Sequence, residues 1–157
     1  MNIEVFCDGA SRGQGQKKRG EAACATVVYK NRKKVAQFAR GLGSRTNNEA
    51  EYEAVIAALL ICALSDFIDP IIYTDSAVVA NQVNGVWKCK SPALFPLLMT
   101  IEEIKSEYRF RLIQVPRNLV WEPDYLANTF LDQLEKKQKE MWYNLYLWKL
   151  LEVINQS

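Results

Sequence analysis

The sequence predicts an α/β domain in which helices flank a five-stranded mixed sheet. Three observations support this fold class. Short β-prone runs and longer helical runs follow one another as three strands, a helix, a strand, helices, a strand and a helix. A chain of 157 residues is long enough for one ordinary domain and too short for two. Its 49% hydrophobic and 24% charged residues are typical of a globular chain with one core.

The first part of the chain predicts three sequential, antiparallel strands, over Ile3–Cys7, Ala22–Tyr29 and Val35–Leu42. Residues 11–20 contain three glycines and four basic residues, and they predict a loop between the first two strands. The basic cluster at Lys30–Lys34 is interpreted as a solvated hairpin turn in preference to a nucleic-acid contact, because charge runs are usually solvated.

The rest of the chain alternates helices with short strands. Apolar periodicity, acidic residues early in helices and breaks at Asp69-Pro70 and Asn84-Gly85 set the boundaries. Helices are expected over Thr46–Ala63, Ser76–Val83, Leu94–Glu107 and from Pro123 to near the C-terminus, and strands over Ile71–Tyr73 and Arg109–Val115.

Composition limits the classes of protein that fit. The formal net charge of +2 decides little, because a nucleic-acid binder can be nearly neutral if its charges are segregated. No apolar run approaches the ~20 residues of a membrane-spanning helix, and we see no signal peptide. The four cysteines form no Cys-x-x-Cys pair, so we expect neither a zinc site nor disulfides, and a reduced, cytoplasmic protein.

The most informative feature is a set of acidic residues that follow or interrupt apolar segments. Asp8 follows Val5-Phe6-Cys7, and Asp75 follows Ile71-Ile72-Tyr73-Thr74. Carboxylates gathered at a sheet rim repel one another and lose hydration, and a divalent cation between them relieves both costs. Mg²⁺ suits such a site because it prefers oxygen ligands.

Ordinary structural roles remain open for these residues. Asp8-Gly9 is a common turn dipeptide, and Asp75-Ser76 is a common helix cap. Glu51, taken alone, fits a solvated helix position.

Several motifs, in order along nearly the whole chain, resemble those of type 1 ribonucleases H. The resemblance rests on 6–11 (FCDGAS), 46–54 (TNNEAEYEA), 73–76 (YTDS), 81–90 (NQVNGVWKCK), 115–117 (VPR) and 124–128 (DYLAN). It implies the ribonuclease H-like fold, with a catalytic domain over residues 1–140. Residues 141–157 run beyond the family's usual end, and we expect them to form an aromatic-rich helical extension of the same domain, so that the C-terminal helix is extended.

The resemblance implies an endonuclease that hydrolyses the RNA strand of RNA–DNA hybrids with two Mg²⁺ ions, for which Mn²⁺ can substitute. Asp8, Glu51, Asp75 and Asp124 are the expected catalytic, metal-binding carboxylates. Asp8 would be shared by both ions, with Glu51 and Asp75 on the leaving-group side and Asp124 on the side where water is activated.

The resemblance also assigns nucleic-acid contacts. Thr46, Asn47 and Asn48 match family positions that touch the hybrid, and the same triplet fits a helix cap. Ser11 and Gln14 lie where the family's first loop approaches RNA. Phosphate contacts by 17–19 (KKR) and a solvated loop are equally compatible with the sequence.

The chain departs from the family around the fourth carboxylate. It contains no histidine, and Gln114 stands where many relatives have one that assists proton transfer or product release. Val120 replaces a frequent asparagine, for which Asn118 could serve. Gln114 and Arg117 are therefore expected only as accessory residues, and turnover is more in question than metal binding.

The C-terminal extension is rich in aromatic and aliphatic residues. Two interpretations stay open, since it could pack over the domain's own core or form an interface with a second copy or a partner protein. Three other functions also remain: a non-catalytic hybrid-binding module, a nuclease for another duplex, and an interaction protein that works through this extension.

Overall fold

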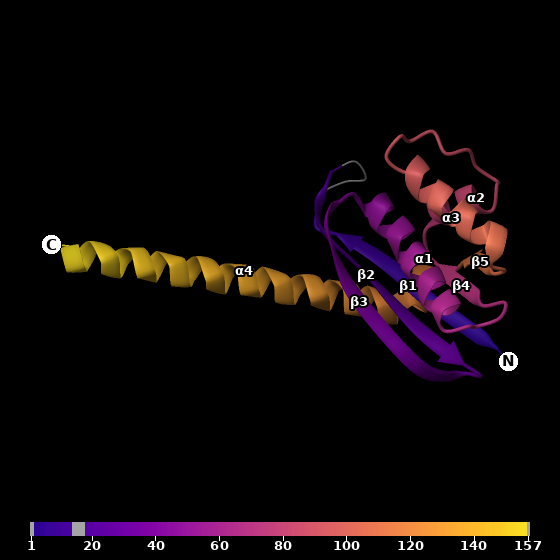
Figure 1. The fold of residues 1–157 in the computed structure, drawn as a ribbon, viewed down its shortest axis with the longest axis horizontal. Helices are drawn as coiled ribbons and strands as arrows, with labels where there is room; N and C mark the ends of the chain where they lie inside the picture. The colour runs from indigo at the N-terminus through magenta and orange to yellow at the C-terminus, as the bar shows by residue number, and fades with distance from the viewer. Residues whose placement is uncertain (1, 14–17, 157) are drawn as a thin grey trace.

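The sheet has five strands and mixed direction, as the sequence predicts. The structure is a computed structural model that describes residues 2–13 and 18–156. The strands are β1 (Ile3–Ser11), β2 (Gly20–Lys30), β3 (Lys33–Arg45), β4 (Ile71–Thr74) and β5 (Arg111–Gln114). Their order in the sheet is β3-β2-β1-β4-β5. β1, β2 and β3 are antiparallel, whereas β4 and β5 run parallel to β1 (Figure 1).

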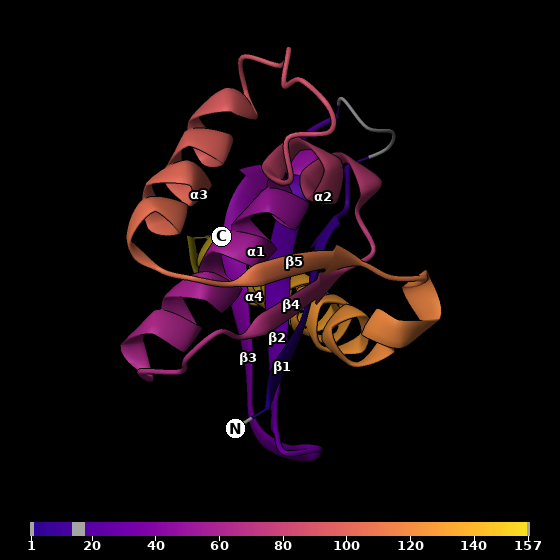
Figure 2. The ribbon, with the colours of Figure 1, turned by 90° about the vertical axis from the view of Figure 1, so that its right-hand side faces the viewer.

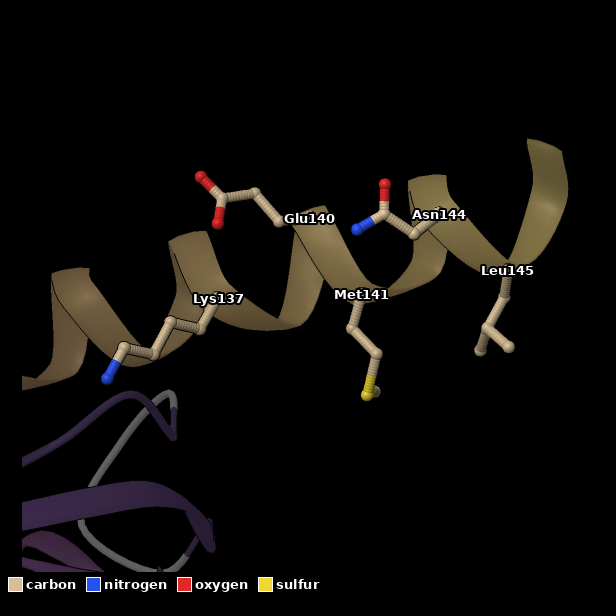
Figure 3. A pocket seen from close by; sticks show the side chains of 5 residues that line it. All are labelled: Lys137, Glu140, Met141, Asn144 and Leu145. Atoms are coloured by element: carbon tan, nitrogen blue, oxygen red, sulfur yellow. The ribbon is translucent and has the colours of Figure 1, made fainter. Parts of the chain in front are cut away.

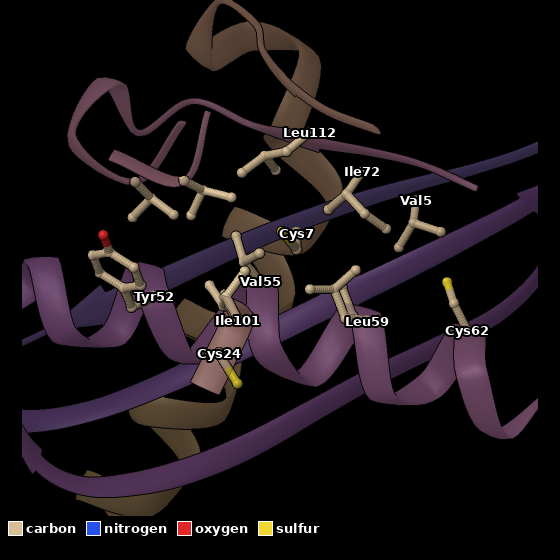
Figure 4. Packing of buried hydrophobic residues seen from close by; sticks show 14 of the residues in the cluster. Val5, Cys7, Cys24, Tyr52, Val55, Leu59, Cys62, Ile72, Ile101 and Leu112 are labelled. Carbon is tan, nitrogen blue, oxygen red and sulfur yellow. The ribbon is translucent and has the colours of Figure 1, made fainter. Parts of the chain in front are cut away.

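Helices cover both faces of this sheet. α1 (Asn47–Leu64), α2 (Ala77–Val83) and α3 (Phe95–Glu107) lie on one face, and α4 (Trp121–Gln156) begins on the other (Figure 2). The larger core lies between the sheet and the first three helices, with Val5, Tyr52 and Leu59 fully buried (Figure 4). On the opposite face, Ala23 and Ala25 of β2 pack against Ala127 and Leu131 of α4. Three of the four cysteines are buried core residues, and all four are free thiols, as predicted.

The β2–β3 connection is the predicted hairpin turn. Asn31 and Arg32 have φ values of 51° and 68°, the left-handed conformation that two-residue hairpin turns require. Lys30–Lys34 are exposed. This agrees with the solvated-turn interpretation of the basic cluster.

Several predicted boundaries differ from the structure, among them the end of β3 at Arg45 and the start of β5 at Arg111, and the largest difference is at the end of β1. β1 continues to Ser11, beyond the predicted end at Cys7, because β2 pairs with Asp8–Ser11 through Ala25–Ala22. The parallel neighbour β4 pairs only with Glu4–Phe6. α4 starts at Trp121, after a 3₁₀ turn over Arg117–Val120, so that Pro123 lies in its first turn, where proline is tolerated.

The last part of α4 leaves the domain. Beyond Glu135, which still pairs with Arg12, the helix extends away from the sheet as a single rod (Figure 1). The large apolar side chains of residues 141–154 are between 38% and 68% exposed. The interpretation that this segment packs over the domain's own core is therefore wrong. The segment is rich in apolar residues, but none of the described helices is long and apolar enough to cross a membrane.

Candidate active site

Four carboxylates from four different segments line one hollow of about 430 Å³. Asp8 comes from β1, Glu51 from α1 and Asp124 from the first turn of α4, while Asp75 directly follows β4. These are the four residues that the sequence predicts. Residues far apart in the chain thus meet toward the carboxyl ends of the interior strands β1 and β4.

Strand register brings Asp8 and Asp75 together. Phe6 of β1 is paired with Tyr73 of the parallel strand β4, and each aspartate lies two residues further along its own chain segment. Because side chains alternate along a strand, Asp8 points to the same face as Phe6. Neither ordinary structural role holds: Asp8 lies inside a strand, and the cap of α2 is Ser76, which accepts a hydrogen bond from Val79 N.

A close contact between α1 and β1 places Glu51. Gly9 N donates to Glu51 Oε1 at 3.0 Å. A Cβ atom on Gly9 would lie 2.2 Å from the carbonyl of Ala50, so only glycine allows the helix to approach this closely. At the start of α1, Thr46 accepts from Glu49 N and Glu49 accepts from Thr46 N, which is a complete capping box. Because α1 approaches β1 so closely at Gly9, Glu51 is buried in the site and is not a solvated helix residue.

The start of α4 is held by contacts of Asp124 and of the residues that follow it. Asn128 Nδ2 donates to Asp124 Oδ1 at 3.1 Å. Arg12, which follows β1, donates to Asn128 O at 3.1 Å and to Asp132 Oδ1 at 2.7 Å. The end of β1 is therefore linked to the turns of α4 that follow the fourth carboxylate.

The hollow is electrostatically unfavourable for its own carboxylates. Asp8 and Glu51 are each 5% exposed. Burial, followed by the negative charge of Glu51, raises the pKa of Asp8 far above its ordinary value. Burial also raises the pKa of Glu51. The two carboxyl groups therefore tend to keep protons, unless a bound cation supplies the positive charge instead.

Three of the four carboxylates, two of them buried and one half-buried, are arranged to bind a divalent cation. Each of Asp8, Glu51 and Asp75 offers an oxygen, and these oxygens lie within 4.8 Å of one another. Glu51 Oε2 is buried and has no hydrogen-bond partner among the described residues. A hard cation would give this oxygen a partner and offset the repulsion, and an all-oxygen donor set suits Mg²⁺. Asp124 lines the hollow but lies outside this group of three.

Most predicted nucleic-acid contacts surround the hollow. Ser11, Asn47, Asn48 and Arg117 line it. Ser11 Oγ donates to Arg45 O at 2.8 Å and accepts from Gly13 N at 3.1 Å, so one lone pair of this oxygen remains for a ligand. Arg117 is the only basic side chain among the described residues that line the hollow.

The remaining predicted residues lie at its edge or elsewhere. Thr46 precedes the two lining asparagines as the cap of α1, so the cap and binding interpretations of this triplet are compatible. Gln114 is exposed at the end of β5 and does not line the hollow. Asn118, considered as a substitute for the usual asparagine, lines a separate hollow beside Phe6 and Tyr29. Gln14 lies outside the described residues.

Sequence reasoning gave no role to Asn128 and left that of Arg19 open. Arg19 forms an ion pair with Glu49 (3.0 Å) and donates to Ser44 O, so it braces the capping box instead of facing the hollow. The four-residue spacing between Asp124 and Asn128 was the available signal for their contact, because side chains at that spacing are neighbours on a helix.

Comparisons with known proteins agree with this geometry. Residues 1–146 match the family model for RNase H. Ribonuclease HI of Halobacterium salinarum is 34% identical over 132 residues, which cover 83% of this chain and 64% of the relative. The crystal structure of RNase H1 from the same organism has a TM-score of 0.78 at 33% identity and covers 85% of this chain and 99% of that one. That of LC11-RNase H1 in complex with an RNA/DNA hybrid has a TM-score of 0.77 at 28% identity, with 85% and 99% covered. This chain spans between 36% and 64% of the length of the curated relatives that it matches.

Proposed function

This chain belongs to the RNase H family, and we propose that it is a ribonuclease H that hydrolyses the RNA strand of RNA–DNA hybrids. The observation that carries the proposal is the convergence of Asp8, Glu51, Asp75 and Asp124 on one hollow, with a buried Glu51 oxygen that lacks a partner among the described residues. We assign residues 1–140 to the catalytic domain and 141–157 to its C-terminal extension, and we expect the protein to be cytoplasmic.

In this proposal the four carboxylates hold two Mg²⁺ ions, with Mn²⁺ as a substitute. Bound cations would supply positive charge to the phosphate in the transition state and make water a stronger nucleophile. Asp8, Glu51 and Asp75 form the compact part of the site. Asp124 completes it from α4, and the hydrogen bond from Asn128 fixes its orientation.

The surrounding side chains would bind and orient the substrate. Arg117 can pair with a phosphate of the nucleic acid at the mouth of the hollow. Asn47 and Asn48 present amides that can donate and accept at groove edges, while Thr46 can bond a phosphate. Ser11 can accept from a 2′-hydroxyl, and Gln14 is proposed beside it from the sequence.

A preference for hybrid follows from shape and 2′-hydroxyls. A protein can sense hydroxyls on one strand of a duplex without reading bases. The LC11 relative has been solved with an RNA/DNA hybrid, which supports the same substrate class here. Since the chain contains no histidine, proton transfer to the leaving oxygen cannot use one, and Gln114 is proposed only as an accessory hydrogen-bonding residue.

The test compares three duplexes of one sequence: RNA–DNA hybrid, double-stranded RNA and double-stranded DNA. Each is incubated with Mg²⁺, with Mn²⁺ or with EDTA. We expect cleavage of the RNA strand of the hybrid only, with either metal and not with EDTA. Asp75→Asn should lose this activity, whereas Asp66→Asn, an exposed aspartate outside the hollow, should keep it.

Two outcomes would contradict the proposal. A folded sample that binds hybrid and cleaves nothing with either metal would be a non-catalytic hybrid-binding module. Faster cleavage of double-stranded RNA or DNA than of hybrid would make the chain a nuclease for another duplex.

A further inference from the structure

The C-terminal tail, residues 141–156, exposes far more apolar surface than a monomer ordinarily leaves in water. Figure 3 shows Met141 and Leu145 extending from α4 on the side away from Glu140. A hollow of about 450 Å³ in this region is lined by α4 residues alone, which makes it a groove along one helix and not an enclosed site. The large apolar side chains of the tail are at least 38% exposed.

The exposed side chains on and beside one side of the tail supply a large part of the area that a stable dimer buries. Tyr143 and Tyr146 are 63% and 64% exposed. Since an aromatic side chain buries about 150–250 Å² when fully covered, these two offer roughly 400–650 Å² in two copies. The aliphatic residues of the tail add to this, and specific interfaces bury about 1,200–2,000 Å² in total.

The arrangement of apolar residues is self-complementary. Tyr143, Leu147, Leu150 and Ile154 recur at spacings of four, three and four residues and so form a stripe along one side of the helix. This spacing reads the same in both directions. If a second tail lies antiparallel about an axis between residues 148 and 149, Leu147 meets Leu150 of the second copy and Tyr143 meets its Ile154.

The charges of the tail are compatible with this pairing. Its only charged residues are Lys149 and Glu152. At 100° per residue, both lie roughly 130–170° around the helix from the stripe. Stripe-to-stripe contact therefore buries no ionised group, which would be costly without a partner.

We propose that two copies of this chain associate through their tails, packed antiparallel and stripe to stripe. The pairing is isologous, because the same surface of each copy contacts the other about a two-fold axis. It also places the two nuclease domains at opposite ends of the paired helices. This inference goes beyond the proposed hydrolysis and does not depend on it.

The first test is the mass of the full chain in solution, without metal or substrate, over a range of concentrations. A chain of 18.0 kDa should reach twice that mass. The double variant Leu147→Glu/Leu150→Glu should remain at the mass of one chain, because it puts charges into the stripe. The matched control, Met141→Glu/Leu145→Glu, adds the same charges to the opposite side and should still dimerise.

If the wild-type chain stays monomeric up to its solubility limit, a second copy does not cover the tail, and the proposal is wrong. Assemblies that grow beyond a dimer, or equal loss of association in both double variants, would overturn the stripe as the interface. Circular dichroism of each variant confirms that the chain is folded.

A second measurement tests the direction of pairing. Lys139→Cys is made in a Cys89→Ser background. Since the other three cysteines are buried, each copy then has one accessible site for a spin label. In the antiparallel pair these sites are about 28 Å apart along the axis, at a rise of 1.5 Å per residue. A separation of about 10 Å, the spacing of two adjacent helices side by side, would indicate parallel pairing and contradict the proposal.

Discussion

Asn128 Nδ2 donates a hydrogen bond to Asp124 Oδ1 at 3.1 Å, one helical turn along α4. Asp124 is the carboxylate that lies outside the compact group formed by Asp8, Glu51 and Asp75. It is also half-buried, whereas Asp8 and Glu51 are buried. Its orientation therefore depends more on this one contact than on packing.

Asn128→Leu should lower kcat about 10- to 100-fold and raise the Mg²⁺ concentration needed for half-maximal rate. A hydrogen bond to a charged group is worth about 1.5–3 kcal/mol, and this change removes one. Cleavage rates across a Mg²⁺ titration measure the effect. Gln133→Leu, at an exposed position of the same helix, is the control, and equal Mg²⁺ curves for both variants would contradict the positioning role.

Gly9→Ala should destabilise the folded chain by about 3 kcal/mol or more, because its Cβ would lie 2.2 Å from backbone atoms of Ala50. Denaturant unfolding measures this loss. Gly41→Ala is the comparison: its Cβ meets only the ring of Phe130, at 3.0 Å, and a side chain can move aside. Similar costs for the two variants would show that α1 does not depend on the close contact at Gly9.

Without metal, the stability of the chain should fall as pH rises from about 5 to 8. Burial raises the pKa of Asp8 and of Glu51, so the folded state binds protons more tightly than the unfolded state, whose carboxyls titrate near pH 4. Stability from this source is complete below that value and is lost as pH rises through the raised values.

Thermal melts in EDTA measure this trend, and each kcal/mol lost lowers Tm by about 2–4 °C in a chain of this size. Asp8→Asn should flatten the decline, and Mg²⁺ added at pH 8 should raise Tm of the wild type. A decline of the same size in Asp8→Asn would exclude the carboxylate pair as its source.

Arg117→Met should raise KM for hybrid and reduce the salt dependence of binding. One lost phosphate contact lowers the slope of log K against log salt by about one. Binding measured at several salt concentrations gives this slope. Lys33→Met, in the exposed hairpin turn, should leave it unchanged, and an equal effect there would mean that the basic turn also contacts nucleic acid.

The residues of the site could be predicted from the sequence better than their surroundings. Asp8, Glu51 and Asp75 stand in motifs, and the motifs identify them without coordinates. The sequence did not indicate that Asp8 lies inside a strand, because the strand extends through pairing with β2, a non-local contact. The burial of Glu51 depends on the approach of α1 to Gly9, and a local pattern does not reveal such a contact.

The C-terminal tail illustrates a second limit. Its composition predicts a helix and an apolar surface, but composition does not say which surface covers it. Only the direction of α4, set by the packing of Ala127 and Leu131 on β2, shows that the tail leaves its own domain.

The most direct test of the account is cleavage of a labelled RNA–DNA hybrid by Asp8→Asn beside the wild type, in Mg²⁺. Asparagine keeps the volume of the side chain and removes the charge at the centre of the carboxylate group. We predict that the rate falls on the order of 10³-fold, equivalent to ~4 kcal/mol of barrier, while the chain stays folded and Asp66→Asn cleaves normally. Full activity in Asp8→Asn would contradict the assignment of this hollow as the catalytic site.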